Sequence, residues 1–401
     1  MTTASADWGS ASEIDDLAGA VAIAGVGEAD HTQASGRTAH AIAAQAVERA
    51  LADAGLAPRD VDGILFSGGI GDAFDARAFH AHFGTSHELW ESPRGGGMVW
   101  AATAPATVAE ALRSGKLRHV LNVFSVSWAT QRPQMVGGPG QFHAEERYKA
   151  SLEVPFGWFP QPVYFATIAR RHMIEFGTKP EQLGAIAVSC RRHANLHPGA
   201  VMREKKLSLA DYLARPMLVD PLRVEDCCLI SDGGGAYLMT TPERARDLRR
   251  PVVLVAGVGE GRSATGLYWA QQREFTSTPQ VFSAPAAFAM ADVTPRDVDV
   301  LALYDPFTIV ALMQIEDMGF CKKGEGGAFV EGDALAFDGG RLPYNTHGGL
   351  LSHAYVLGIS HVIEIVRQLR GEAAAQVRDA EIAVYGGYTG HLASTLVLRR
   401  A

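Results

Sequence analysis

One pattern of helix, turn and strand occurs twice in this chain, and this repeat constrains the fold more than any other feature. Residues 56–66 read LAPRDVDGILF and residues 293–303 read VTPRDVDVLAL. Each string follows an alanine-rich stretch with helical spacing and precedes a strand-like run. A second similar pair, residues 95–115 and 348–371, places a glycine-rich turn before a helix and then a strand. Two matches in the same order indicate a duplicated β-α-β-α-β unit.

The order of elements along the chain predicts an α/β fold. A strand at 20–27 precedes a helix at 38–55 that ends at a glycine, and strands are expected at 62–69 and 118–126. Alternation of this kind places helices on the faces of a sheet. The fold class predicted here is therefore α/β, built from two βαβαβ halves.

The length of 401 residues and the repeat suggest four segments. We expect a flexible N-terminus at 1–16, a first half at 17–128, a loop region completing it at 129–249, and a second half at 250–401. The loop region begins with a stretch rich in glycine, proline and aromatics, which is typical of a functional or covering loop. Its aromatic residues either cover a bulky substrate or belong to the core, and they are Phe142, Phe156, Trp158, Phe159, Tyr164 and Phe165.

Composition and charge exclude several classes of function. The net charge of −8 argues against a nucleic-acid-binding protein, which would need a basic face. The N-terminus is acidic and lacks a signal core, and the apolar run at 17–26 is too short to cross a membrane. The four cysteines form no C-x-x-C or zinc pattern, which favours a reduced, cytoplasmic protein. The strings GVGEAD and GVGEG do not complete a dinucleotide fingerprint, so no cofactor is expected.

Four longer strings resemble the sterol-carrier-protein type of the thiolase superfamily. They are RRHANLHPG through DGGGAYL at 191–238, YDPFTIVALMQIEDMGFC at 304–321, NTHGGLLSHAYVLG at 345–358 and YGGYTGHLASTLVL at 385–398. The similarity covers the chain from about residue 20 onwards. It implies the thiolase fold, in which the two halves form a layered α-β-α-β-α structure.

The departures from the thiolase pattern fall on its reactive side chains. Gly96 stands near the place of the nucleophilic cysteine, and the segment around it contains no serine as a substitute. Tyr355 and Tyr304 replace the two motif histidines, and the second cysteine falls near Tyr385 or Gly386. Acyl transfer through a thiolate therefore looks impossible.

The residues that remain suit aldol chemistry next to a thioester. Turns at Gly96 and Gly387 would offer backbone N–H groups to an enolate oxygen. Loss of the cysteine with gain of two tyrosines resembles the lipid-transfer-protein-type aldolases of bacterial steroid degradation. The resemblance implies that Tyr304 deprotonates or orients the β-hydroxyl and that Tyr355 protonates the enolate, or the reverse. Retro-aldol cleavage of a steroid acyl-CoA would then release a ketone and propionyl-CoA or another short acyl-CoA.

The same resemblance implies partners and further site residues. It predicts a homodimer that binds a small OB-fold protein or hydratase subunit. Gly96, Gly387, His353 and Tyr388 are expected to contact substrate, while Tyr344 ranks lower as a rival to the catalytic pair. No metal is expected, because His353 and His361 would lie eight residues apart on one helix face and no third ligand is evident.

Two alternatives to the aldolase stay open. A thiolase fold without its cysteine would also serve as a non-catalytic scaffold or partner subunit that binds acyl-CoA or lipid. A Claisen enzyme using Cys227, Cys228 or Cys321 is the weaker alternative, because these residues fall outside the nucleophile's helix in the resemblance.

Overall fold

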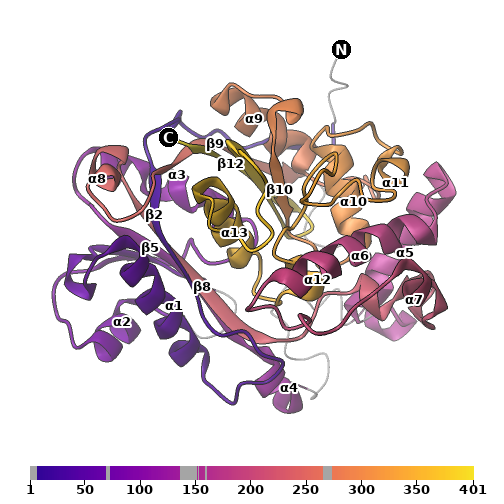
Figure 1. The fold of residues 1–401 in the computed structure, drawn as a ribbon, viewed down its shortest axis with the longest axis horizontal. Helices are drawn as coiled ribbons and strands as arrows, with labels where there is room; N and C mark the ends of the chain where they lie inside the picture. Colours follow the sequence, from indigo (N-terminus) through magenta and orange to yellow (C-terminus); the bar gives the residue numbers. More distant parts are fainter. Residues whose placement is uncertain (1–6, 69–72, 136–150, 152, 159, 265–272) are drawn as a thin grey trace.

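The computed structural model describes residues 7–68, 73–135, 151, 153–158, 160–264 and 273–401. Within these residues, ten strands form one mixed sheet against which helices pack (Figure 1). A separate two-stranded sheet consists of β6 (Met217–Val219) and β7 (Leu222–Arg223). No helix in the described part of the chain is both long enough and apolar enough to span a bilayer.

The first half of the chain contributes one end of the large sheet. Its strands are β2 (Ala22–Glu28), β3 (Gly63–Leu65), β4 (Trp90–Ser92), β5 (Val120–Ser127) and β8 (Asp232–Thr240). Strand β3 runs parallel to β4 and β5, β5 runs antiparallel to β8, and β8 runs antiparallel to β2. Strand β4 therefore ends the sheet on this side.

The second half repeats this pairing scheme. Its strands are β9 (Val253–Ser263), β10 (Val300–Leu303), β11 (Ile382–Tyr388) and β12 (Leu392–Arg400), and β1 (Gly9–Ala11) adds to β9. Strand β10 is parallel to β11, β11 is antiparallel to β12, and β12 is antiparallel to β9. Strands β2 and β9 pair with each other and join the halves. The predicted duplication is confirmed.

The repeated PRDVD strings have the same structural role in both halves. Each begins with a short 3-10 helix, at Pro58–Asp60 and at Pro295–Asp297, and each leads into the first parallel strand of its half. The last residue of each helix caps its start, because Asp60 accepts the N–H of Ala57 at 2.8 Å and Asp297 accepts that of Thr294 at 2.7 Å. The same capped turn therefore leads into the sheet strand in both halves.

Two helices occupy the layer between the halves. Helix α3 (Trp100–Arg113) comes from the first half, yet it packs on β9, β11 and β12 of the second. Helix α13 (Ile359–Arg370) comes from the second half and packs on β2 and β8 as well as on β10 to β12. Helices α1 (Ala39–Ala54) and α9 (Gln280–Ala291) cover the sheet from outside. The layered α-β-α-β-α arrangement is confirmed.

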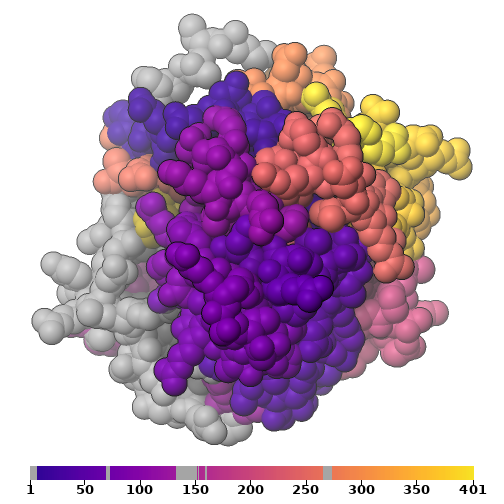
Figure 2. Space-filling model, turned by 90° about the vertical axis from the view of Figure 1, so that its left-hand side faces the viewer, coloured from indigo at the N-terminus to yellow at the C-terminus, as the bar shows by residue number. Residues whose placement is uncertain are grey.

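The remaining helices frame this core. They are α2 (Ala76–Phe83), α4 (Trp128–Met135), α5 (Gln161–Phe176), α6 (Pro180–Leu196), α7 (Leu209–Ala214), α8 (Pro242–Arg246), α10 (Thr308–Asp317), α11 (Gly326–Phe329) and α12 (Gly349–Ser352). Helices α5, α6, α7, α10 and α11 gather at one side of the sheet (Figure 1). The opposite side, which Figure 2 faces, is built mainly from the first half of the chain, with the segment around α8 above it.

Two sequence expectations need correction or restriction. The helix expected over 348–371 is broken between α12 and α13, because Leu357 and Gly358 adopt positive φ angles of 48° and 81°. Much of the aromatic loop, including Phe142 and Phe159, lies outside the described residues. The other four aromatics divide: Phe156 is 82% exposed, Trp158 is partly buried against the core, and Tyr164 and Phe165 are buried on α5.

Candidate active site

Tyr304 directly follows strand β10 and is held by the main chain. Its N–H donates to the carbonyl of Gly386 at 2.8 Å, and its own carbonyl accepts the side-chain amide of Gln314 at 2.8 Å. The side chain is 5% exposed. The next residue, Asp305, accepts the N–H of Leu350 at 2.8 Å and contacts His361 Nε2 at 3.0 Å. These bonds tie the end of β10 to the start of α12.

Tyr355 lies in the turn between α12 and α13, not on a helix as expected from the sequence. Its N–H donates to the hydroxyl of Ser231 at 2.8 Å. Its ring packs on Trp128, with ring centroids 4.8 Å apart. The break in the helix therefore allows the residue to leave the helical path and to reach the end of the sheet.

The two phenols predicted to be catalytic meet. Their hydroxyl oxygens lie 3.3 Å apart, although the residues are 51 positions apart in the chain. Burial raises the pKa of both groups, and for Tyr304 the adjacent Tyr355 raises the pKa further. Both hydroxyls are thus protonated at neutral pH and suited to donate or relay a proton, rather than to act as standing phenolates.

A third phenol, Tyr385 on β11, completes the group. Its hydroxyl donates to the carbonyl of Met98 at 3.0 Å. A Cβ atom placed on Gly358 would lie 2.2 Å from the Tyr385 hydroxyl and 3.3 Å from Tyr304 Cδ2, so Gly358 lies between the two rings. The sequence analysis placed the second thiolase cysteine near Tyr385 but assigned the tyrosine no role. That alignment was the signal that could have identified it.

The glycines expected to bind an enolate oxygen are already engaged. The N–H of Gly96 donates to Asn122 Oδ1 at 2.7 Å, and Asn122 Nδ2 donates back to the Gly96 carbonyl at 3.0 Å. Gly387 pairs with Ser394 in the sheet, and its carbonyl accepts from Gln280 at 2.8 Å. The expectation that Gly96 offers an open N–H donor is therefore not met in this structure.

The cysteines do not supply a replacement nucleophile. All four are free, and burial raises the pKa of each thiol, to about 12 for Cys227 and Cys321 and well above the usual value for Cys190 and Cys228. A nucleophilic thiolate requires a lowered pKa. The raised pKa values therefore disfavour a cysteine-dependent Claisen reaction.

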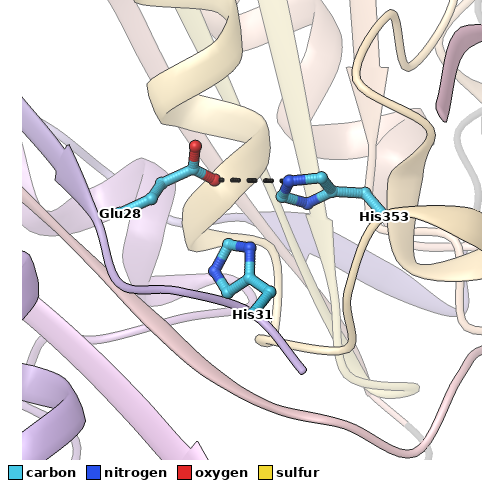
Figure 3. A group of neighbouring side chains, drawn as sticks. All are labelled: Glu28, His31 and His353. Atoms are coloured by element: carbon cyan, nitrogen blue, oxygen red, sulfur yellow. Dashed lines mark ion pairs between the residues drawn. The ribbon is translucent and has the colours of Figure 1, made fainter. Parts of the chain in front are cut away.

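His353 and Tyr388, the other two residues expected to contact substrate, are both buried. The ring of His353 contacts the rings of His31, His197 and His347, and it faces Glu28 (Figure 3). Tyr388 is buried at the end of β11, where burial and Asp317 raise its pKa. Glu28 and His31 lie beside His353, and the sequence analysis did not identify either as a neighbour of this histidine.

A cavity of about 820 Å³ opens near the phenols. It reaches Cys228, whose N–H donates to the carbonyl of Pro306 at 2.9 Å, two residues after Tyr304. Its lining includes apolar residues, four basic side chains (Arg191, Lys205, Lys206 and Arg215) and the acidic Glu225, which pairs with Arg215 at 3.1 Å. Basic residues outnumber acidic ones in this lining, which favours a ligand that carries anionic groups.

Comparison with known proteins agrees with this geometry. Residues 261–400 match the family model described as thiolase C-terminal domain-like. The steroid side-chain-cleaving aldolase of Thermomonospora curvata is 33% identical over 389 residues, which cover 95% of this chain and 98% of that protein. The 17-hydroxy-3-oxo-4-pregnene-20-carboxyl-CoA lyase of Mycobacterium tuberculosis is 34% identical, with 95% and 100% covered.

Solved structures include one similar protein that shares both sequence and fold and one that shares only the fold. A structure described as the Ltp2-ChsH2(DUF35) aldolase has a TM-score of 0.86 and 32% identity, with 96% of this chain and 99% of that chain covered. Human mitochondrial 3-ketoacyl-CoA thiolase has a TM-score of 0.65 at 15% identity, with 96% and 100% covered, and it shares the fold alone. This chain therefore belongs to the steroid side-chain-cleaving aldolases, a family of lyases built on the thiolase fold.

Proposed function

We propose that this enzyme cleaves a β-hydroxy acyl-CoA, the side-chain thioester of a steroid, into a ketone and propionyl-CoA or another short acyl-CoA. The observation that carries the proposal is the pair of buried phenols, Tyr304 and Tyr355, whose hydroxyls lie 3.3 Å apart. They occupy the motif positions at which thiolases have imidazoles. The steroid side chain is the substrate class that the names of the similar aldolase and lyase give.

The proposed reaction requires one proton to travel from the β-hydroxyl to the α-carbon. Tyr304 receives the hydroxyl proton while its own proton passes to Tyr355, and Tyr355 protonates the α-carbon. The O–H electron pair forms the ketone C=O, and the Cα–Cβ bond breaks to give the enolate that takes the proton. Both phenols end as they began, which agrees with pKa values that burial holds above the usual range for tyrosine.

The basic cavity supports recognition of coenzyme A. Lys205 and Lys206 are exposed and suited to bind phosphates, while Arg191 is 8% exposed and donates to Ser352 at 2.9 Å. Cys228 and Leu229 line the apolar part, and Leu229 donates its N–H to Leu350 at 3.0 Å beside α12. A thioester arm bound there would lead from the surface to the loop that follows Tyr304.

The assembly that we propose contains two copies of this chain and a DUF35 partner with an OB-fold. The DUF35 partner is inferred from the description of the similar aldolase structure. Dimerisation through the edge of the sheet is supported by β4, an edge strand on which Trp90 is 38% exposed. We place the enzyme in the cytoplasm, a reducing compartment that suits its four free cysteines.

The test uses 17-hydroxy-3-oxo-4-pregnene-20-carboxyl-CoA, the compound in the name of the similar lyase. The chain would be incubated with this thioester, with and without the co-expressed DUF35 protein, and products followed by mass spectrometry. We expect equal amounts of a ketosteroid and propionyl-CoA. Tight binding of the thioester without cleavage, with the partner present, would instead support a non-catalytic scaffold.

Site variants then test the assignment. Tyr304→Phe and Tyr355→Phe should each slow cleavage about 10²–10⁴-fold, whereas Tyr212→Phe should retain it. Tyr212 is a suitable control because its buried hydroxyl donates to Asp226 at 2.8 Å, outside the phenol group. Cleavage that keeps its wild-type rate in both site variants would preserve the reaction but refute the assignment of residues.

A further inference from the structure

A second group of buried polar side chains lies where the two halves meet. Glu28 ends β2, and His31 follows it in the first half, while His353 lies between α12 and α13 in the second. One ligand atom from each residue lies within 4.8 Å of the other two. Figure 3 shows the carboxylate of Glu28 facing the ring of His353, with the ring of His31 close to both.

Each of the first two residues keeps one ligand atom available. Glu28 uses Oε2 to accept from Arg367, and its Oε1 lies 3.8 Å from Nε2 of His353. His31 contacts the carbonyl of Gly234 through Nε2 at 3.3 Å, which leaves Nδ1 as its free nitrogen. Metal-bound histidines commonly donate their other ring N–H to a backbone carbonyl, and metal-bound carboxylates are held by further hydrogen bonds.

His353 has no such partner in the described structure. Its side chain is fully buried, and neither ring nitrogen has a hydrogen bond within the described residues. An unpaired buried polar group is costly and is uncommon in a folded protein. An imidazole with a free ring nitrogen offers a lone pair that a metal ion can accept.

We propose that Glu28, His31 and His353 bind one divalent first-row cation, with zinc(II) as the expected ion. Two imidazoles and a carboxylate match the ligand preference of zinc, which binds such atoms at about 2.0–2.2 Å. Ligands at those distances lie roughly 3.3 Å apart, so the three side chains close by up to about 1.5 Å when the ion binds. Rotation of the half-buried His31 accounts for part of that closure.

The environment provides charge balance and access. Arg367 on α13 donates to the carboxylate of Glu28, which places a fixed positive charge beside this ligand. As a carboxylate ligand, Glu28 would partly offset the charge of the cation. A cavity of about 500 Å³ lined by Glu28, His31 and His197 gives the ion a route from the surface.

An ion bound at this position would connect the two halves of the chain close to the active site. It would link β2 of the first half to the segment after α12 in the second. His353 is two residues before Tyr355, so the ion would restrict the turn that presents this phenol. We expect it to stabilise the joined halves and to position Tyr355, without contacting the reacting atoms.

The test is titration of the untagged, chelator-treated full chain with cobalt(II) alone and then with zinc(II). We expect about one equivalent of cobalt to bind, with a visible d–d absorption that zinc displaces, and a rise of several degrees in melting temperature. His353→Ala and Glu28→Gln should weaken cobalt affinity at least about 100-fold. Loss of a direct ligand should exceed the roughly 10–100-fold loss that follows removal of a ligand's hydrogen-bond partner.

His82→Ala is the matched control, because its ring pairs with Glu48 at 2.8 Å in an exposed histidine–carboxylate pair. This variant should bind cobalt as the wild type does. His31→Ala, at a half-buried position, guards against misfolding of the His353 variant, and circular dichroism would confirm the fold. Failure of the wild-type chain to bind cobalt, or equal binding by the wild type and all three ligand variants, would overturn the proposal.

Discussion

The phenol pair predicts a specific pattern of non-additivity. Tyr304 and Tyr355 would be changed to phenylalanine singly and together, which removes one or both hydroxyls at the 3.3 Å contact. A positioned acid or base contributes about 10²–10⁴-fold to a rate, or roughly 3–5 kcal/mol in the barrier. Each single variant should lose that much in kcat/KM. Because a relay fails when either member is missing, the double variant should lose no more than about tenfold beyond the worse single variant.

The single and double variants of Tyr304 and Tyr355 should also differ in their free energy of unfolding. Each single substitution leaves a buried hydroxyl without its partner, which costs about 1–3 kcal/mol, whereas removing both hydroxyls is close to neutral. The double variant should therefore be more stable than either single one, as measured by chemical denaturation of the full chain. Rate losses that multiply, to about 10⁴–10⁸-fold for the double variant, would show that the hydroxyls act independently and refute the relay.

Three further predictions concern Gly358, pH and His193. Gly358→Ala should reduce kcat/KM and destabilise the fold. The φ of 81° at this position disfavours a side chain, and an added Cβ would lie 2.2 Å from the Tyr385 hydroxyl. Unchanged steady-state kinetics would contradict this packing. Because burial raises the pKa of Tyr304 and Tyr355, the neutral phenols persist and kcat/KM should stay level up to about pH 9; a rise between pH 7 and 9 would indicate a phenolate base. Burial lowers the pKa of His193 from 6.5 to about 4, so the unfolded chain binds more protons than the folded chain between these pH values. The free energy of unfolding should therefore fall by at most about 3 kcal/mol as pH drops from 6.5 towards 4. His193→Gln should reduce this loss in denaturation curves measured over that pH range.

Local sequence signals were sufficient for the fold. The two PRDVD strings identified equivalent turns because each aspartate caps its own turn, a contact within three residues. Tyr304 and Tyr355 were predicted from their positions in motifs, and the structure brings their hydroxyls within 3.3 Å of each other. Helix α13 was placed too early, because periodicity does not show that Leu357 takes a positive φ angle in the final packing.

Long-range contacts explain what the sequence did not reveal. Glu28, His31 and His353 come from opposite ends of the chain and meet only when α13 packs on strands of both halves. Likewise, the N–H of Gly96 is occupied by Asn122, 26 residues away, which no local pattern indicates. A glycine-rich turn predicts room for a donor but not whether the donor is free.

Two helix starts that meet beside the phenols lead us to expect a second way of stabilising an enolate, one that depends on no single side chain. The start of α3 and the start of α13 meet directly, because the N–H of Met98 donates to the carbonyl of Leu357, just before Gly358 caps α13. Tyr385 donates to Met98 at the same point, and Tyr304 adjoins Gly358. The positive ends of two helix dipoles therefore converge beside the phenols. Duplication of the half places these helix starts together, and we expect them to stabilise an enolate bound there although the cysteine and the histidines have been replaced.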